Sequence, residues 1–458
     1  MARNPVVFIH GYSDTAESFQ TWATLLEARG YDVTHIHSCN YRTLTNEVSL
    51  RDIAEAFDRA LRLRAGLDQG EEFDAIVHST GMLVIRAWLA TYAERRSRLK
   101  HLVGLAPATF GSPLAHKGRS WLGAIFKGEK DIASPDFLEA GDRVLDGLEL
   151  GSRFTWDLAH LDLLSDKPVY GTDDGTPYVF VFCGTEGYRG IRQLVNEPGT
   201  DGTVRWAGCA LDTRKIIVNL SRQDQAQRRF EVKPWHNVDA PFYPVAGKNH
   251  GSLLRDPGEE LVNLVVQGLE VSSVDDLAAW QQEAEQITGT ERQRLRDDGQ
   301  EWQQFVVRAT DERGDPITDY NLQLLHGTAK DDDLAAFDTD VHVYSSDRSL
   351  RSFHVKLGDI APERLQSLWA RIMVSSGTRL VGYAGEVDRV VIGDAGEPDP
   401  TGWWEGWLDL TRFLEVHDQP RPGDRFTFFY PFTTTLIDLR LNREPLPLEG
   451  PNEVAVFT

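Results

Sequence analysis

Three segments of the chain carry residue types that together could perform nucleophilic catalysis. Ser79 stands in Val-His-Ser-Thr-Gly, directly after an apolar run typical of a buried strand. Asp201 stands in Thr-Asp-Gly-Thr-Val and His250 in Lys-Asn-His-Gly-Ser, each after a later predicted strand. The histidine can take the serine proton and return it to a leaving group, while the aspartate fixes the tautomer of the imidazole. The chain order Ser, Asp, His therefore predicts a serine nucleophile served by this relay.

The serine is predicted to stand on a tight turn between a strand and a helix, which exposes its hydroxyl above the sheet. Small residues are expected two positions before it and two positions after it, because strand and helix approach closely there. Gly81 meets this expectation and Val77 does not. Taken alone, a serine at this place is also explained as an ordinary helix N-cap.

A second feature of this chemistry is an oxyanion hole. The His-Gly step after the first predicted strand turns the chain sharply and is followed by Tyr12. The backbone N–H groups of Tyr12 and Thr80 could then stabilise a tetrahedral oxyanion together. A plain turn from strand to loop is the alternative. His10 is interpreted as a loop-fixing residue and His78 as a packing residue beside the serine.

Other acids and histidines lack this placement after a late strand. They are Asp173, Asp174, Asp212, Asp239 and His236. The relay needs no cofactor, and we expect none. The three cysteines, Cys39, Cys183 and Cys209, provide neither a disulfide framework nor a clustered metal site.

The predicted site requires a sheet that holds its loops at one edge. The first 270 residues alternate strand and helix patterns, which predicts a mainly parallel sheet covered by helices on both faces. The expected strands are 5–9, 31–36, 73–77, 101–105, 178–182, 215–219 and 242–245, and the expected helices are 16–29, 49–67 and 82–92.

Residues 113–170 interrupt this alternation with an insertion rich in apolar side chains. We interpret the insertion as a helical cap whose apolar face covers the serine and contacts acyl chains. The alternative is a rigid helical subdomain that only shapes a pocket. The expected substrate contacts are Trp121, Phe126, Leu145, Phe154 and Trp156.

The rest of the chain has a different pattern. Residues 1–271 are expected to form the α/β domain, 272–300 a helical linker, and 301–458 a β-sandwich built from short alternating strands. The expected strands are 305–309, 321–325, 341–344, 352–357, 371–374, 387–392, 425–429 and 435–441. Aromatic residues at 403–407 and 426–432 either form a binding face or fill the sandwich core. The aspartate run 331–333 fits a solvated loop better than a calcium site.

Composition excludes several classes of protein. The 458 residues carry a formal net charge of −22, which disfavours nucleic acids and anionic lipid surfaces as partners. No apolar run approaches the ~20 residues of a membrane-spanning helix. The first predicted strand begins at Pro5, which leaves no room for a signal peptide, so we expect a cytoplasmic location, with export by a leaderless route left open.

The motifs resemble those of the α/β-hydrolase superfamily and, within it, the bacterial lipases and the lecithin–cholesterol acyltransferase-like lipases. The resemblance rests on the His-Gly step at residues 10–11, the serine segment, the Asp201 and His250 loops, and Ala-Pro-Ala-Thr-Phe-Gly-Ser-Pro-Leu at 106–114. Val77 departs from the pattern, and Met82 stands where many relatives carry a glycine. The resemblance implies an α/β-hydrolase fold with a lid in the insertion; it does not extend to residues 300–458.

These observations predict a serine carboxylic-ester hydrolase of lipase or esterase type that forms an acyl-enzyme. The expected substrates are hydrophobic acyl esters, either small molecules, lipids or polyesters, with at most transient contact with a lipid surface. One alternative is a thioesterase, amidase or acyltransferase that uses the same residues. Another is an inactive hydrolase fold that serves as a scaffold, for which Val77 would be the sign.

Overall fold

The computed structural model describes residues 3–10, 19–36, 47–63, 67, 70–92, 94–115, 142–221, 230–233, 240–328, 334–344, 346–360, 362–378, 380–390, 402–414 and 427–445. The chain divides into two compact units. The first, here called the α/β unit, comprises residues 1–213, 235–298 and 432–434. The second, here called the β-rich unit, comprises 214–234, 299–431 and 435–458.

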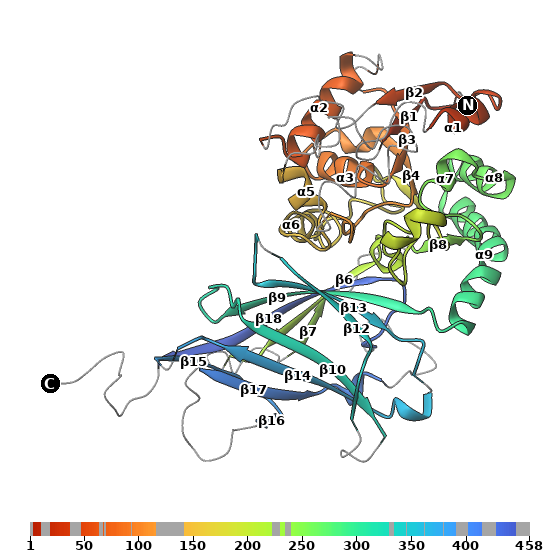
Figure 1. Cartoon of the computed structure of the whole chain (residues 1–458). Helices are drawn as coiled ribbons and strands as arrows, with labels where there is room; N and C mark the ends of the chain where they lie inside the picture. The colour runs from red at the N-terminus through yellow and green to blue at the C-terminus, as the bar shows by residue number, and fades with distance from the viewer. Residues whose placement is uncertain are drawn as a thin grey trace. The chain divides into compact units, whose positions relative to one another are not determined.

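The α/β unit contains a sheet of six strands, all parallel, in the order β2-β1-β3-β4-β5-β8 (Figure 1). Their bounds are β1 (Val6–Ile9), β2 (Val33–Ile36), β3 (Phe73–His78), β4 (Leu99–Leu105), β5 (Tyr178–Gly184) and β8 (Phe242–Val245). β1 and β3 are buried along their whole length, as expected for parallel strands covered on both faces. Six of the seven strands expected from the first 270 residues are confirmed.

Helices pack on this sheet and position the loops at its edge. α2 packs against α3, and α8 packs against α9. The helices are α1 (Gln20–Glu27), α2 (Leu50–Leu63), α3 (Gly81–Thr91), α5 (Asp142–Leu148), α6 (Arg153–Leu161), α7 (Ser252–Arg255), α8 (Glu259–Gly268) and α9 (Val274–Asp297), with 3-10 turns at 96–98, 190–195 and 206–208. Among the described residues, no helix has both the length and the apolarity to cross a membrane.

The expected linker at 272–300 is instead a helix of the α/β unit. Trp280 of α9 is buried between two strands, with ring centroids 4.4 Å from Phe180 of β5 and 5.1 Å from Tyr243 of β8. Its indole N–H donates to the carbonyl of Leu264 in α8 at 2.8 Å. A mostly polar sequence suggested a linker, but the buried Trp280 packs on the sheet, and Arg292 also donates to the carbonyl of Phe242 in β8 at 2.9 Å.

The expected α/β strand at 215–219 is wrong: β6 (Thr213–Asn219) lies in the β-rich unit, antiparallel to β7 (Phe230–Lys233) and beside β18. Its burial alternates from Lys215 onward, with Ile216 and Val218 buried and their neighbours half-buried. That alternation is typical of an antiparallel strand with one face on a core, whereas the parallel strands are buried on both faces.

The β-rich unit contains two sheets, β11-β10-β14-β17-β16 and β12-β13-β9-β18-β6-β7, with β15 paired to β18. Buried residues of both sheets form one core, which includes Phe305 and Leu439 from one sheet and Ile372 and Leu408 from the other. The strands are β9 (Trp302–Asp311), β10 (Tyr320–Gly327), β11 (Ala335–Ala336), β12 (Thr339–Val343), β13 (Leu350–Lys356), β14 (Ser367–Ser375), β15 (Val381–Ala384), β16 (Arg389–Val390), β17 (Trp403–Asp409) and β18 (Thr434–Pro445), with 3-10 turns at 362–364 and 411–413. The predicted sandwich is confirmed.

Details of the sandwich differ from expectation. A strand was expected at 425–429, but residues 427–429, the described part of that segment, are not a strand. Conversely, β17 is a strand that the sequence did not predict. Of the aromatics, Phe428 fills the core and Trp403 is 46% exposed. The aspartate run 331–333 and Phe426 lie outside the described residues.

A short segment of the C-terminal half belongs to the α/β unit. Phe432 has a left-handed backbone, with φ of 64°, and its ring centroid lies 5.3 Å from that of Phe242 in β8. The hydroxyl of Thr434 donates to the carbonyl of Ala207 at 2.8 Å. The boundary between the units is therefore crossed several times and not once near residue 271.

A buried ion pair fastens the sheet at the ends of the strands far from the predicted site. His101 Nδ1 lies 2.6 Å from Asp74 Oδ1, and His101 Nε2 lies 2.7 Å from the carbonyl of Val271. Burial alone would lower the pKa of His101, but the hydrogen bond and charge of Asp74 outweigh burial and raise the pKa above its usual value.

This pair predicts a pH-dependent stability. A histidine whose pKa is raised by folding contributes its full stabilisation below the unfolded pKa of about 6.5, and loses it as pH rises through the folded pKa. Between about pH 6 and about pH 9, wild type should therefore lose more free energy of unfolding than His101→Asn, as measured by urea denaturation. Equal losses in the two proteins would contradict this assignment.

Candidate active site

Ser79 occupies a strained turn between β3 and α3. Its φ is +53°, in the left-handed region that non-glycine residues rarely adopt. The turn is held from several sides, because the Ser79 carbonyl accepts from the N–H groups of Met82 and Ala108, at 3.2 and 3.0 Å, and the Ser79 N–H donates to Leu105 at 3.3 Å. Such strain persists only where surrounding contacts fix it, and it is common at functional sites.

Gly81 is required at the start of α3. A Cβ added there would lie 2.5 Å from the backbone carbonyl oxygen of Ile9 in β1, which cannot move aside as a side chain could. The expectation that a small residue stands two positions after the serine is thus explained by the approach of the helix to the neighbouring strand.

We expect Gly81→Ala to lower the free energy of unfolding by about 1–3 kcal/mol, because the added methyl overpacks a fixed backbone contact. Urea denaturation measures this change. The matched control is Gly289→Ala in the interior of α9, where a Cβ would meet only the mobile carboxylate of Glu285, at 3.1 Å. This control should be neutral or stabilising, since alanine favours a helix over glycine. Equal midpoints for the two variants would contradict the role given to Gly81.

Val77, the departure from the expected pattern, is accommodated by the neighbouring strand. It is fully buried and lies opposite Gly104 of β4 in the parallel register. A Cβ on Gly104 would lie 2.9 Å from the terminal methyl of Met82 and 3.1 Å from the ring of Pro107. The space expected from a small residue at 77 is supplied by Gly104, and the Met82 side chain uses it.

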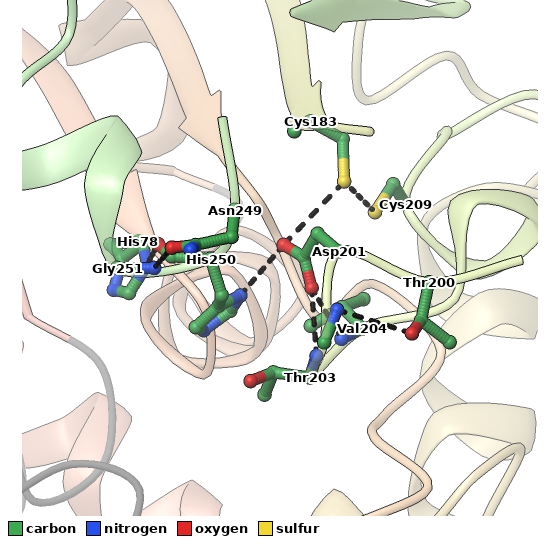
Figure 2. A network of polar contacts seen from close by, with 12 residues as sticks. His78, Cys183, Thr200, Asp201, Thr203, Val204, Cys209, Asn249, His250 and Gly251 are labelled. Carbon is green, nitrogen blue, oxygen red and sulfur yellow. Dashed lines mark hydrogen bonds and ion pairs between the residues drawn. The ribbon is translucent and has the colours of Figure 1, made fainter. Parts of the chain in front are cut away.

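Asp201 and His250 form a buried pair (Figure 2). His250 Nδ1 lies 2.8 Å from Asp201 Oδ2, and the backbone N–H of His250 donates to the backbone carbonyl of Asp201 at 3.0 Å. The other carboxylate oxygen, Oδ1, accepts from the N–H groups of Thr203 and Val204, at 2.9 and 2.8 Å. Asp201 and His250 are both completely buried. The loops after β5 and β8 are thereby joined through the two residues that the sequence predicted for the relay.

Glycine allows these loops to approach. A Cβ on Gly184, at the end of β5, would lie 2.3 Å from the carbonyl oxygen of Lys248, two residues before His250. The N–H of Glu186 donates to the same oxygen at 2.9 Å. Gly202 has a φ of +97°, which turns the chain directly after Asp201. Gly184 and Gly202 therefore allow the backbone conformation in which the two predicted site residues pair.

His78 connects the serine turn with His250. Its Nε2 lies 3.1 Å from the backbone carbonyl of His250, and the two ring centroids are 4.5 Å apart. Burial, followed by the charge of His250, holds the pKa of His78 well below its usual value, so the ring is neutral near pH 7. The sequence suggested packing only, because nothing in the local pattern shows a contact with a loop 172 residues away.

Two cysteines lie beside Asp201, and the sequence did not predict the contacts that link the three residues. Cys183 Sγ lies 3.7 Å from Asp201 Oδ2 and 3.4 Å from Cys209 Sγ (Figure 2). Burial raises the pKa of both thiols, so each remains a protonated S–H group near neutral pH. This contact could not be predicted from the sequence, because Cys183 and Cys209 lie 26 positions apart and match no cysteine motif.

The structure describes only some of the remaining predicted site residues. Thr80 is buried at the N-terminus of α3, where backbone N–H groups have no partner within the helix. Tyr12, Trp121 and Phe126 lie outside the described residues. Leu145 lies on α5, and Phe154 and Trp156 on α6; Leu145 and Trp156 are buried and Phe154 is half-buried. Their contact with substrate stays a prediction.

The described part of the insertion is anchored to the helix that follows the serine. The guanidinium of Arg86 in α3 makes two hydrogen bonds to the carboxylate of Asp162, at 2.8 and 2.9 Å, and both side chains are fully buried. The hydroxyl of Tyr170 donates to the same carboxylate at 2.8 Å. For residues 142–170 this network favours the rigid helical subdomain over a moving lid.

The parallel sheet, the strained serine turn and the loops after β5 and β8 together define an α/β-hydrolase fold. A scan against models of protein families finds no match for the chain, and a search of curated proteins finds none.

Among solved structures, the chain is similar to phospholipase PlaB from Legionella pneumophila in complex with thio-NAD. The TM-score is 0.73 and the identity 23%, over 96% of this chain and 94% of that chain. A second structure of phospholipase PlaB from Legionella pneumophila matches with the same TM-score and coverage at 22% identity. At this identity the likeness establishes the fold, and it extends over both units.

Proposed function

We propose that this protein is a serine ester hydrolase that acts on hydrophobic acyl esters through Ser79, His250 and Asp201. The observation that carries the proposal is the buried Asp201–His250 pair, 2.8 Å apart, whose histidine is hydrogen-bonded to the residue next to a serine in a strained turn. A hydrogen-bonded acid and histidine, close to a serine held in a strained turn between strand and helix, are the parts that nucleophilic acyl transfer needs.

The reaction would run through an acyl-enzyme. Ser79 Oγ attacks the ester carbonyl carbon while His250 Nε2 takes its proton; the C–O bond to the alcohol then breaks, and His250 gives the proton to the leaving oxygen. Water, deprotonated by the same nitrogen, attacks the acyl-enzyme, and the proton returns to Ser79 as the carboxylic acid leaves. The N–H of Thr80, with that of Tyr12 as the proposed second donor, would stabilise both oxyanions. The steps require no cofactor.

Two observations support a lipid-like substrate. The insertion that follows β4 is rich in apolar residues; its helix α6 packs against the helix that follows Ser79, and its helix α5 packs against α6. The structure of similar fold over nearly the whole chain is described as a phospholipase. We therefore propose medium or long acyl esters, phospholipids among them, as the substrate class.

The test is hydrolysis of p-nitrophenyl esters from acetate to palmitate, and of phosphatidylcholine vesicles, by wild type and Ser79→Ala in parallel. We expect turnover that depends on Ser79 and is greatest with acyl chains of about eight carbons or more, since each buried CH₂ contributes about 0.8 kcal/mol of binding. A maximum at acetate or butyrate would overturn the substrate class and leave a small-ester esterase.

A fluorophosphonate probe separates the remaining outcomes, because it labels an activated serine whatever the natural substrate is. Labelling of wild type and not of Ser79→Ala, without ester hydrolysis, would move the assignment to an amide or thioester. Absence of labelling in the folded wild type would overturn the proposed nucleophile and favour an inactive scaffold.

A further inference from the structure

We propose that His78 is a positioning residue for catalysis: its Nε2–H donates to the backbone carbonyl of His250 and thereby sets the place of the base relative to the adjacent Ser79. The inference rests on the proposed function, in which His250 is the base. It assigns a mechanical role to a residue that the reaction scheme itself does not use.

Two different residues, Asp201 and His78, hold His250 through hydrogen bonds. Its backbone N–H and its Nδ1 both bind Asp201, at 3.0 and 2.8 Å, and these contacts orient the imidazole toward the acid. Its backbone carbonyl lies 3.1 Å from His78 Nε2. Of these three contacts, only the last comes from the strand that carries the nucleophile. Because His78 is covalently joined to Ser79, this hydrogen bond relates the base to the serine directly.

The chemistry of the bond fixes the state of His78. A backbone carbonyl only accepts, so the hydrogen must reside on Nε2 of His78. The ring is buried, and its pKa is held well below the usual value by burial and by the charges of His250 and His10. A neutral ring serves the reaction, because it leaves the imidazolium that forms on His250 without a second positive charge at 4.5 Å.

The ring of His78 is itself held by aromatic packing. Phe19, directly before α1, contacts it edge-on with centroids 6.4 Å apart, and contacts His10 edge-on at 4.6 Å. All three residues are buried. A donor fixed in this way can hold the loop of His250 to a fraction of an ångström, which is the precision that proton transfer from Ser79 needs.

Three variants separate a donor role from packing. His78→Gln keeps an N–H near the Nε2 position, His78→Asn withdraws it by one methylene, and His78→Leu removes it at similar volume. We expect kcat on p-nitrophenyl esters to fall about 10–100-fold in the leucine and asparagine variants with KM within about twofold, and the glutamine variant to recover to within about fivefold of wild type. His101→Gln, which alters another buried histidine in β4, should lower stability and leave kcat unchanged.

Two kinetic results would overturn the proposal. One is a folded leucine or asparagine variant with kcat within twofold of wild type. The other is a folded glutamine variant as impaired as the asparagine variant, which would mean that the donor is not the cause.

A readout independent of turnover keeps this inference apart from the proposed function. Nitrogen NMR of protein labelled with ¹⁵N-histidine reports the tautomer of each ring in the full-length chain. We expect His78 as the neutral Nε2–H tautomer between about pH 6 and about pH 8, whether or not an ester is hydrolysed. The Nδ1–H tautomer, or protonation in this range, would overturn the positioning role even if Ser79-dependent activity is found. If His78 has the expected tautomer but no ester is hydrolysed in a Ser79-dependent way, the result would instead count against the proposed function.

Discussion

Asp201→Asn is expected to lower kcat on a p-nitrophenyl ester about 10⁴-fold while the protein stays folded. The N–H groups of Thr203 and Val204 bind Oδ1 of Asp201, so an asparagine must keep its carbonyl oxygen at that position. Its NH₂ group then faces His250 Nδ1, where an acceptor stood at 2.8 Å. Two donors cannot pair, so the imidazole takes the tautomer with hydrogen on Nε2, which cannot accept the serine proton.

The measurement is steady-state kinetics together with circular dichroism of both proteins. Asp173→Asn is the matched control, because Asp173 is an exposed acid that had competed with Asp201 in the sequence. It should retain full activity. An Asp201→Asn protein with more than about a tenth of the wild-type kcat would exclude Asp201 as the orienting acid, since a tautomer error of this kind costs far more.

Arg86→Met is expected to lower the free energy of unfolding by about 3–5 kcal/mol, the largest stability effect that we predict for a single substitution. Removing the guanidinium leaves the carboxylate of Asp162 buried with Tyr170 as its remaining donor side chain among those described. The guanidinium also donates to the carbonyl of Thr109, so a backbone acceptor loses its donor as well. Urea denaturation gives the change in free energy.

The control for this variant is Arg153→Met in α6. Arg153 pairs with Asp157 at 2.9 Å, but both side chains are 40% exposed or more. Solvent screening limits such a pair to about 0.5 kcal/mol. Similar destabilisation in the two variants would mean that the buried network does not anchor the insertion to α3.

The α/β fold and the main elements of the site could be predicted because their signals are local. A strand that is buried on both faces reads as a continuous apolar run, as in β1 and β3, and the serine turn carries its own glycine. The acid and the histidine lie in short segments whose glycines fix the backbone.

What the sequence did not predict depends on contacts between distant segments. His78 and Cys183 are ordinary residues in their own strands, and only the return of the chain after β5 and β8 brings them to His250 and Asp201. The departure at Val77 looked like a defect because the compensating Gly104 belongs to another strand. β6 was placed in the wrong sheet since a short apolar strand does not reveal its partner.

The pairing of β6 with β18 has a consequence for how the chain folds. β6 ends at Asn219 and its neighbour begins at Thr434, so roughly two hundred residues must be synthesised before the edge of β6 is covered on that side. Pairings of such high contact order form slowly. During that interval the chain exposes an incomplete sheet edge, a species prone to aggregation or to capture by chaperones. The yield of folded protein recovered from denaturant should accordingly fall as the protein concentration during refolding rises.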